Sequence, residues 1–274
     1  MRKRNAVKTL ILNLIAVFVS AIMLVPLLLV VINAFKTKRE AASLNFNLPA
    51  EWHFENFDTV IKEGKLVASF LNSFQYAACA AVLCIIVSVL AAWVLSRNRT
   101  KLNRILYWIV IMGIAMPVNH VSLMKVMQVL HLVNTRIGLI LLYTAIQIPF
   151  SVFLSYGFVE GVPVELDEAA VLDGSSAVQM AIYVMMPLMK PVLVTNFILV
   201  FMNCWNEFIL PLYYMNTTTA WPMTLSIYNF FGRYASEWNL VCADILLTWL
   251  PVIIVYLIGQ KYIIEGMTVG AVKG

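Results

Sequence analysis

The sequence predicts an all-α integral membrane protein with six transmembrane helices. Of the 274 residues, 62% are hydrophobic and only 12% are charged, and the mean hydropathy is +0.86. Apolar runs of the roughly 20 residues needed to cross a bilayer recur along the chain. This composition lies outside the range of soluble globular chains. The net charge of +5 is better explained by basic cytoplasmic loops than by binding to nucleic acid.

The first predicted span covers about residues 9–34, directly after a basic N-terminus. This run is longer than the roughly 7 to 15 residues of a signal-peptide core, so we expect an uncleaved span. The polar stretch 35–71 predicts an ordered extramembrane loop. The other spans are expected at about 74–95, 105–124 (interrupted by Pro117), 137–158, 192–214 and 238–264. Together they predict one transmembrane domain, residues 1–274.

A short loop between the second and third spans sets the orientation of the chain. It holds four cations and no acid: Arg97, Arg99, Lys101 and Arg104. Short loops rich in Lys and Arg stay in the cytoplasm. With six spans, both termini then lie in the cytoplasm, and so does the loop between the fourth and fifth spans, residues 159–191.

We name residues 159–191 the acidic loop. It holds one cation, Lys190, and five carboxylates: Glu160, Glu165, Asp167, Glu168 and Asp173. The pattern predicts a first helix of about 11 residues that starts at Pro163, carries acids in its early turns and ends at a left-handed Gly174. A second helix is predicted to start at Ser176, with Gln179 completing a capping box, and to end near Pro187.

The first helix of the acidic loop is too short to be stable alone in water. Its apolar residues also fall on two sides of the helix. Val164 and Val171 lie on one side, and Leu166, Ala169 and Ala170 lie on the other. We therefore expect other bodies to grip this helix from two directions.

The residues required for several chemistries are missing. The sequence contains no GxxxxGK[ST] phosphate loop, no HExxH and no GxSxG. The cysteines, Cys79, Cys84, Cys204 and Cys242, all lie in apolar runs without metal-ligand spacing. We expect no catalytic residue, no metal site and no cofactor on this chain. If ATP drives the protein, another subunit must bind it.

Several motifs carry a resemblance to a known family. GluAlaAla at 168–170, AspGly at 173–174 and the prolines at 187 and 191 resemble the signature cytoplasmic loop of permease subunits of bacterial ABC importers. Further segments are similar to the shorter permease of maltose-type carbohydrate importers, and the resemblance covers the whole chain. These are AsnSer at 72–73, TrpAsnGluPhe at 205–208, GluTrp at 237–238, LeuPro at 250–251 and the C-terminal GlyMetThrValGlyAlaValLysGly. Met185 and Met186 replace the usual branched aliphatics, a change expected to be neutral because Met repacks easily.

The resemblance implies a multi-pass subunit of a sugar importer in the bacterial plasma (inner) membrane. An extracytoplasmic sugar-binding protein would deliver the sugar to a pair of permeases, expected to be a heterodimer. Two ATP-binding subunits, holding ATP and Mg, would drive alternating access. The first helix of the acidic loop would then be the coupling helix, with Glu168, Ala169, Ala170, Asp173 and Gly174 at its contact with the ATPase. Glu168 either makes a charge contact or braces the loop, or it is only a helix-dipole acid on a solvated surface.

For two further sites the sequence leaves two interpretations open. A charge inside a span costs roughly 2.5 to 3.5 kcal/mol, so Glu207 should face protein or water. Trp205, Asn206 and Glu207 either line the sugar path, or Glu207 holds the helix bundle together. The second reading is favoured because the longer permease makes most sugar contacts in the family's prototype. In the tail, Gly270 and Lys273 either reach between the ATP-binding subunits or belong to a frayed terminus.

A different class is a secondary transporter or channel for a small polar solute. Such proteins show ionisable residues at the midplane and often repeated halves with broken helices. Here Glu207 alone qualifies clearly, and no repeat is evident. A membrane-embedded enzyme would need a nucleophile with a base, or a metal cluster, at depth. Neither class explains the acidic loop.

Overall fold

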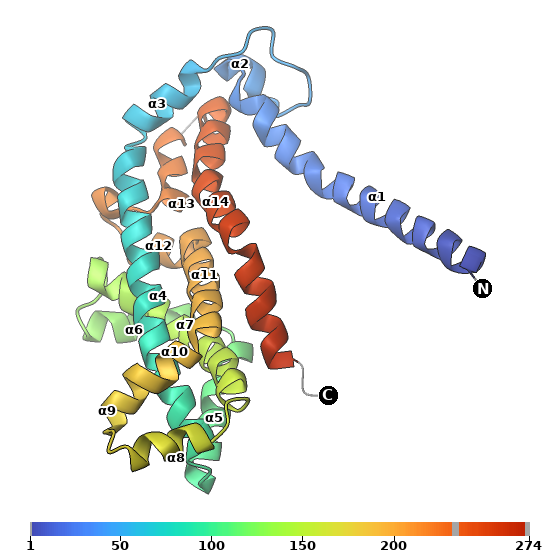
Figure 1. The fold of residues 1–274 in the computed structure, drawn as a ribbon. Helices are drawn as coiled ribbons and strands as arrows, with labels where there is room; N and C mark the ends of the chain where they lie inside the picture. The colour runs from blue at the N-terminus through green and yellow to red at the C-terminus, as the bar shows by residue number, and fades with distance from the viewer. Residues whose placement is uncertain (1, 232–235, 272–274) are drawn as a thin grey trace. The chain divides into compact units, whose positions relative to one another are not determined.

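A computed structural model describes residues 2–231 and 236–271, with side chains described for 9–231 and 236–264 (Figure 1). The regular elements of the described residues are all helices, and the pairing outside helices is a single bridge between Phe231 and Ser236. The predicted all-α fold is confirmed. The chain divides into two compact units, each considered by itself below. Unit 1 is Met1–Val67 with Ser226–Leu250, and unit 2 is Ala68–Leu225 with Pro251–Gly274.

The helices vary widely in length. In chain order the α-helices are α1 Arg2–Ala34, α2 Lys38–Ala41, α3 Glu55–Glu63, α4 Leu66–Arg97, α5 Lys101–Ala115, α6 His120–Val129, α7 Arg136–Val159, α8 Glu165–Leu172, α9 Ala177–Gln179, α10 Met186–Leu188, α11 Lys190–Asn206, α12 Ile209–Tyr214, α13 Met223–Ser226 and α14 Trp238–Ala271. A π-helix, η1, covers Met180–Met185, and 3₁₀ turns cover Thr218–Ala220 (η2) and Ile227–Phe230 (η3).

Within the described residues, four helices are long and apolar enough to cross a membrane. They contain the segments Thr9–Ala34, Leu66–Arg97, Arg136–Val159 and Trp238–Ile264. Two sharply bent pairs also qualify: α5 with α6, bent by 117°, and Ala177–Leu188 with α11, bent by 80°. If each pair is one span, there are up to 6 spans. The count of six is consistent with this structure and stays a prediction.

Two of the predicted spans are broken in the structure. The span predicted at 105–124 ends as a helix at Ala115, because Met116 precedes Pro117 and takes an extended conformation with ψ 125°. Asn119 then caps α6 by accepting a hydrogen bond from the Ser122 amide at 3.0 Å. The span predicted at 192–214 is interrupted after Asn206, and α12 begins at Ile209.

Unit 1 contains residues 35–65, which we name the outer loop after the side of the membrane on which the sequence predicts it. A buried lysine organises it: Lys36 is 1% exposed, and its ammonium donates to Asn33 Oδ1 at 3.0 Å, to Asn45 O at 2.8 Å and to Asn45 Oδ1 at 2.9 Å. All three donors of the ammonium are therefore used. Burial lowers the pKa of Lys36, and the nearby Glu40 carboxylate opposes that shift.

Asn56 continues this network through unit 1. Its side-chain amide donates to Ala34 O at 2.8 Å and to Lys36 O at 2.9 Å, and its Oδ1 accepts from Asn239 Nδ2 at 3.0 Å. The Phe35 ring packs against three aromatic rings of the same loop, Trp52, Phe54 and Phe57, with centroids 5.1 to 5.2 Å away. The outer loop is thus an ordered body held by contacts within unit 1, and its predicted order is confirmed.

Unit 2 is built around α7, against which α5, α11 and α12 pack. A Cβ at Gly113 of α5 would lie 2.8 Å from Pro149 Cγ of α7, so only glycine permits this close approach. At the end of the unit where the acidic loop begins and ends, Val89 and Ala92 of α4, Val159 of α7, Met185, Met189 and Val192 form a buried cluster. This cluster is the base on which the acidic loop rests.

Candidate functional site

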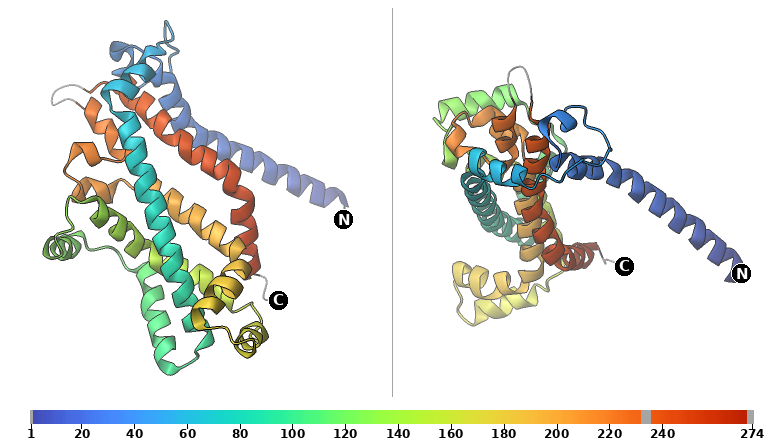
Figure 2. Two further views of the ribbon diagram at one scale, coloured as in Figure 1. Left: turned by 60° about the vertical axis from the view of Figure 1, so that its left-hand side comes forward. Right: turned by 90° about the horizontal axis from the view of Figure 1, so that it is seen from above.

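The acidic loop lies at the same end of unit 2 as the connection between α4 and α5 (Figures 1 and 2). Its first helix, α8, has Val164 as N-cap and three acids in its first turn, Glu165, Asp167 and Glu168. Negative charge is favourable there because it faces the positive end of the helix dipole. Pro163 was predicted to be the first helical residue, but it precedes the N-cap, where its carbonyl accepts only a long 3.4 Å bond from Leu166 N. The helix therefore has 8 residues, fewer than the predicted length of about 11.

The end of α8 matches the prediction for Gly174. This glycine has φ +81°, in the left-handed region that favours glycine. Its amide bonds to Val171 O at 3.0 Å, and the Ser175 amide bonds to Ala170 O at 3.0 Å. These two bonds form a Schellman motif, which satisfies carbonyls that the helix end would leave unpaired.

A buried ion pair holds α8 to the end of α4. Arg97 Nε donates to Asp167 Oδ2 at 2.6 Å, and Arg97 Nη2 donates to Val162 O at 2.9 Å. The two side chains are only 15% and 13% exposed. Asp167 and Ala170, one turn apart, are the buried residues of α8. The ion pair thus fixes which side of the helix faces its own unit.

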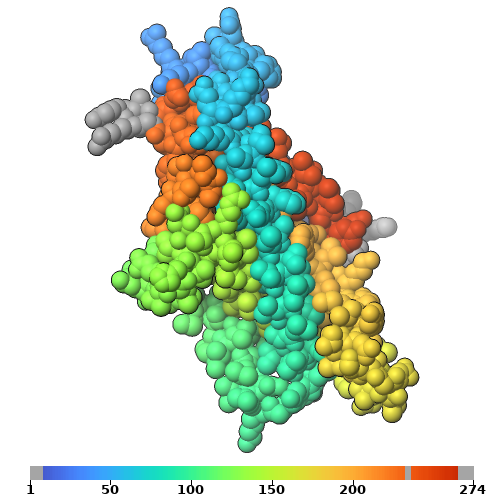
Figure 3. Space-filling model, turned by 90° about the vertical axis from the view of Figure 1, so that its left-hand side faces the viewer, coloured from blue at the N-terminus to red at the C-terminus, as the bar shows by residue number. Residues whose placement is uncertain are grey.

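The rest of the α8 surface is uncovered. Leu166, Val171 and Leu172 are 41%, 59% and 88% exposed, and Glu168 and Ala169 are exposed beside them. Asp167, Glu168, Val171 and Leu172 line a shallow depression on this surface. In Figure 3 the acidic loop, in yellow, projects from the end of unit 2 beside α4. Exposed apolar side chains on a projecting helix are typical of a surface that binds another protein.

The second helical segment starts as predicted. Ser176 Oγ accepts from Gln179 N at 3.4 Å, and Gln179 Oε1 accepts from Ser176 N at 2.8 Å, which completes the capping box. The segment runs Ala177–Leu188, but its middle is the π-helix η1. Pro187 has no amide hydrogen and its ring would clash with the carbonyl four residues earlier, so a widened turn just before it relieves this conflict. Met185, where the family resemblance departs, is 1% exposed in the cluster below the loop.

The residues suggested for the translocation path occupy the end of α11. Trp205 is 1% exposed, with its ring against Phe70 and Phe201 at 5.6 Å each. Asn206 is exposed and Glu207 is half-buried. Glu207 Oε1 accepts from Ile209 N at 2.8 Å and Leu210 N at 3.0 Å. The carboxylate therefore caps α12, the short helix that follows the break.

Sequence reasoning missed a polar pair next to these residues. Asn203 Nδ2 donates to Gln147 Oε1 at 3.3 Å on an exposed surface of unit 2. Gln147 lies in the middle of α7, and Asn203 precedes Asn206 and Glu207 by three and four residues. Positions i, i+3 and i+4 share one helix face, so this spacing was a signal in the sequence.

The partnership of Arg97 with Asp167 was also missed. Two signals were present: a loop with cations alone and a loop with five acids and one cation, both expected on one side of the membrane. The exact pair could not be read from them, because several acids were equally available. In the structure, Asp167 makes the contact with Arg97 that holds α8 to α4. Glu168 makes no ion pair with any described residue.

The remaining predicted residues are less informative. Asp173 is exposed and ends α8. Gly270 lies in the backbone of α14, and Lys273 lies outside the described residues. Within the part of the chain that the structure describes, no cluster of three or more His, Cys, Asp or Glu side chains is arranged to hold a metal ion.

Comparisons with known proteins identify the family of this chain. Residues 84–268 match the family "binding-protein-dependent transport system inner membrane component". The chain is 30% identical to the probable starch degradation products transport system permease protein AmyC of Thermoanaerobacterium thermosulfurigenes, over 100% of both chains. It is 32% identical to the melibiose/raffinose/stachyose import permease protein MelC of Bacillus subtilis, over 96% of both.

The fold matches a chain in the crystal structure of a bacterial ABC transporter involved in the import of the acidic polysaccharide alginate. The TM-score is 0.81, the identity is 22%, and the match covers 96% of this chain and 98% of the other. The family match covers more than half of the chain, and the relatives align along almost all of it. The chain therefore belongs to the inner membrane components of binding-protein-dependent transport systems, the permeases of ABC importers.

Proposed function

We propose that this chain is one of two permease subunits of an ATP-driven importer of carbohydrates. The relatives AmyC and MelC are named as permeases for starch degradation products and for melibiose, raffinose and stachyose, which supports a carbohydrate substrate. The observation that carries the proposal is the state of α8: it is clamped to α4 on one side and exposed on the other. A helix in this state is suited to receive force from a partner and pass it to the spans.

In this proposal α8 is the coupling helix and seats in an ATP-binding subunit. Leu166, Val171 and Leu172 supply apolar contact, while Glu168, Ala169 and Asp173 border it and Gly174 fixes the helix end. Movement of α8 would reach α4 through the ion pair between Arg97 and Asp167. Ala170 is buried and keeps the helix seated on its own unit. ATP and Mg would be bound by the two ATP-binding subunits, because this chain lacks a phosphate loop.

We also propose that the exposed polar face of α11 and α7 lines the sugar path. Asn203, Gln147 and Asn206 are polar groups on spans, where lipid would leave their hydrogen bonds unmade. Amide side chains suit sugar hydroxyls because they both donate and accept hydrogen bonds. Trp205 is buried and would support this face from behind. Glu207 would shape the path by holding the break between α11 and α12.

The membrane orientation follows the basic loop 97–104. The acidic loop and both termini would be cytoplasmic, and the outer loop would face the extracytoplasmic sugar-binding protein. The tail, with Gly270 and Lys273, would reach between the ATP-binding subunits. Reporter fusions after residue 34 and after residue 97 check the orientation. Cytoplasmic signal from the first fusion and external signal from the second would contradict it.

The first experiment is purification of the tagged chain from native membranes in mild detergent, with identification of the proteins that accompany it and an ATPase assay. We expect a second permease and an ATP-binding subunit, with hydrolysis stimulated by a sugar-loaded binding protein. Recovery of the chain alone, active in uptake without ATP, would contradict the proposal. A secondary transporter or channel would then be the better description, although no present observation favours it.

A matched pair of variants tests the role of α8. Leu172 is 88% exposed on α8 and Leu48 is 70% exposed in the outer loop. Leu172→Asp should abolish recovery of the ATP-binding subunit, because it places a charge in the proposed interface. Leu48→Asp makes the same chemical change elsewhere and should leave that recovery unchanged. Equal recovery of the ATP-binding subunit with both variants would exclude the exposed surface of α8 as its contact.

A further inference from the structure

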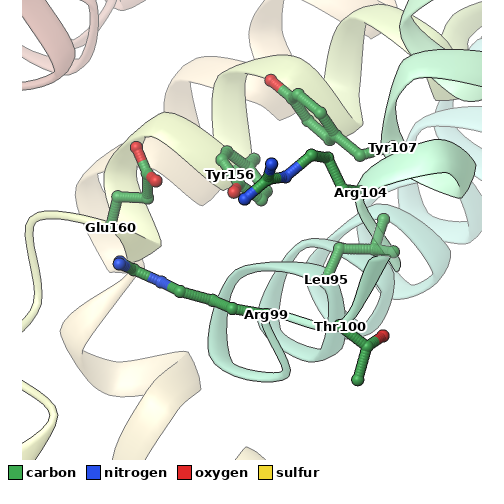
Figure 4. Close-up of a pocket in the computed structure, with 7 residues that line it drawn as sticks. All are labelled: Leu95, Arg99, Thr100, Arg104, Tyr107, Tyr156 and Glu160. Atoms are coloured by element: carbon green, nitrogen blue, oxygen red, sulfur yellow. The ribbon is translucent and has the colours of Figure 1, made fainter. Parts of the chain in front are cut away.

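A pocket of about 170 Å³ lies in unit 2 where the connection between α4 and α5 meets the end of α7 (Figure 4). It is lined by Leu95, Arg99, Thr100, Arg104, Tyr107, Tyr156 and Glu160. This volume is several times the roughly 30 Å³ that one water molecule occupies in the liquid. The pocket is separate from the exposed side of α8 and from the polar face of α11.

The pocket is rich in groups that bind anions. In Figure 4 the Arg104 side chain reaches toward Tyr156, and the Arg99 side chain extends toward the end of α7, where Glu160 lies. Within the described residues, neither guanidinium is in an ion pair. Arg97, by contrast, is turned to the acidic loop and bonded to Asp167. Two guanidiniums and one carboxylate leave the pocket with an excess of positive charge.

Local hydrogen bonds hold the pocket in place. Asn98 O accepts from Thr100 N at 2.9 Å and from Asn103 Nδ2 at 2.7 Å, which makes a tight turn. Thr100 Oγ1 accepts from Asn103 N at 3.2 Å and so caps α5. The rings of Tyr107 and Tyr156 stack with centroids 4.1 Å apart and join α5 to α7. Arg99 and Arg104 therefore project from a braced turn.

The surface next to the pocket is strongly apolar. On α5, Leu102, Ile105, Trp108 and Ile109 are 64%, 57%, 60% and 55% exposed. These residues begin within one helical turn of Arg104, so cationic and apolar surfaces meet at this point. Trp and Tyr are enriched at the boundary between headgroups and hydrocarbon. Basic pockets between spans on the cytoplasmic side suit anionic headgroups.

From this arrangement we propose that the pocket binds a phosphate group, with Arg99 and Arg104 as the charged donors and the Tyr107 hydroxyl as a further donor. Planar guanidiniums match phosphate oxygens in a bidentate manner. The phosphate belongs either to an anionic phospholipid, whose acyl chains would lie on the apolar face of α5, or to a soluble phosphate. The adjoining apolar face favours the phospholipid.

A bound phosphate group would also bear on transport. It would tie the turn between α4 and α5 to the end of α7, from which the acidic loop departs. This consequence rests on the proposed function, whereas the binding itself rests on the pocket and on the proposed orientation of the loop 97–104. Binding is therefore measured without any transport readout, so that a failure of this inference and a failure of the permease proposal can be told apart.

The test is a titration of the purified full-length chain, with its co-purifying subunits, by phosphatidylglycerol and by phosphatidylcholine in native mass spectrometry. Phosphatidylglycerol should bind more tightly. Arg104→Gln should weaken its binding about 10- to 100-fold, the factor that corresponds to the loss of one charge-assisted hydrogen bond. Arg99→Gln/Arg104→Gln should weaken it further. Arg104→Lys keeps the charge without the planar fork and should fall between wild type and Arg104→Gln.

Arg39→Gln is the matched control, because Arg39 is exposed in the outer loop and does not line the pocket. It should bind phosphatidylglycerol like wild type. Equal binding of both lipids to wild type, or unchanged binding in the double variant, would overturn the assignment to a phospholipid. Inorganic phosphate and glycerol phosphate form the second arm. If they bind in a manner dependent on both arginines while lipids do not, the pocket is a soluble phosphate site; if neither source binds, the inference fails.

Discussion

The outer loop and the acidic loop are both long, polar interruptions of an apolar chain, but they are built differently. The outer loop turns inward: Lys36 is buried with three acceptors, and Asn56 bonds to two backbone carbonyls. The acidic loop has one buried ion pair, Arg97 with Asp167, and leaves the apolar residues on the other side of α8 in the open. One loop is held by contacts within unit 1, whereas the other leaves apolar side chains exposed.

Under the proposed function, this difference separates residues that stabilise the chain from residues that couple it to a partner. In the outer loop, the conspicuous charged residue stabilises the loop. In the acidic loop, the proposed function divides stabilisation and partner contact between different residues of one short helix. Variants of the two loops should therefore fail in different assays.

The largest effect is expected for Arg97→Leu. It leaves Asp167 largely buried without its partner, a change that typically costs about 3 to 5 kcal/mol. We expect α8 to detach from α4 and sugar-stimulated ATP hydrolysis to be lost, measured on the reconstituted importer alongside thermal unfolding. Arg97→Leu/Asp167→Leu should recover much of the stability, because no buried charge is left unpaired. Full coupling in the single variant would show that the clamp is dispensable.

A smaller effect, confined to the outer loop, is expected for Lys36→Met. It leaves Asn33 Oδ1 without its donor, at about 1 to 3 kcal/mol for a buried group left unpaired, whereas both Asn45 oxygens keep another donor. We expect faster proteolysis of the outer loop in membranes and unchanged recovery of the ATP-binding subunit. Loss of that subunit in this variant would erase the distinction between the two loops.

Gly174→Ala should have a moderate effect on coupling. A Cβ at this position would meet nothing within 4 Å, so the cost comes only from the positive φ, about 1 to 2 kcal/mol. We expect a reduced ratio of transported sugar to hydrolysed ATP, and a milder reduction for Gly174→Asn because Asn tolerates the left-handed region. Identical ratios for wild type, Ala and Asn would argue that the helix end is not needed for coupling.

The smallest effect concerns the pH dependence of the outer loop. His53 Nδ1 bonds to Glu55 Oε1, which raises the pKa of His53 and lowers the pKa of Glu55. The stabilisation by His53 is full below its unfolded pKa of about 6.5 and is lost as pH rises through its raised folded pKa. The stabilisation by Glu55 is full above about 4.3 and is lost as pH falls through its lowered folded pKa. The pair should be strongest between these limits.

Limited proteolysis of the outer loop across this pH range measures that dependence. The cleavage rate should be lowest between about pH 4.3 and 6.5 and should increase modestly on the alkaline side, because both groups are largely solvated. His53→Gln should remove the alkaline increase. A pH profile that is the same in wild type and variant would show that the pair contributes nothing to the loop.

Local signals in the acidic loop were sufficient to predict its turns. Gly174 and the pair Ser176 with Gln179 depend on backbone geometry within a few residues, and both predictions are confirmed. The start of α8 at Glu165 was missed, because Pro163 is equally compatible with a position just before a helix. The π-helix before Pro187 was also missed, since a widened turn leaves no separate mark in the pattern of apolar residues.

Contacts between distant residues were harder to predict. Arg97 and Asp167 lie 70 residues apart, and charge alone did not select Asp167 from its acidic neighbours. The pairing of Asn203 with Gln147 depends on how α11 lies against α7, which a single sequence does not specify. The role of Glu207 as cap of α12 required knowing that the helix breaks at that residue.

The isolation of α1 has a consequence for how the protein is made. No residue in the most apolar window of Thr9–Ala34 is buried, and the mean hydropathy of this segment is 3.1. A helix satisfies all its backbone hydrogen bonds internally, so this segment needs no other part of the chain to be stable in lipid. It can leave the translocon and settle in the bilayer while the rest of the polypeptide is still being synthesised. We therefore expect the first span to enter the bilayer before it makes any tertiary contact.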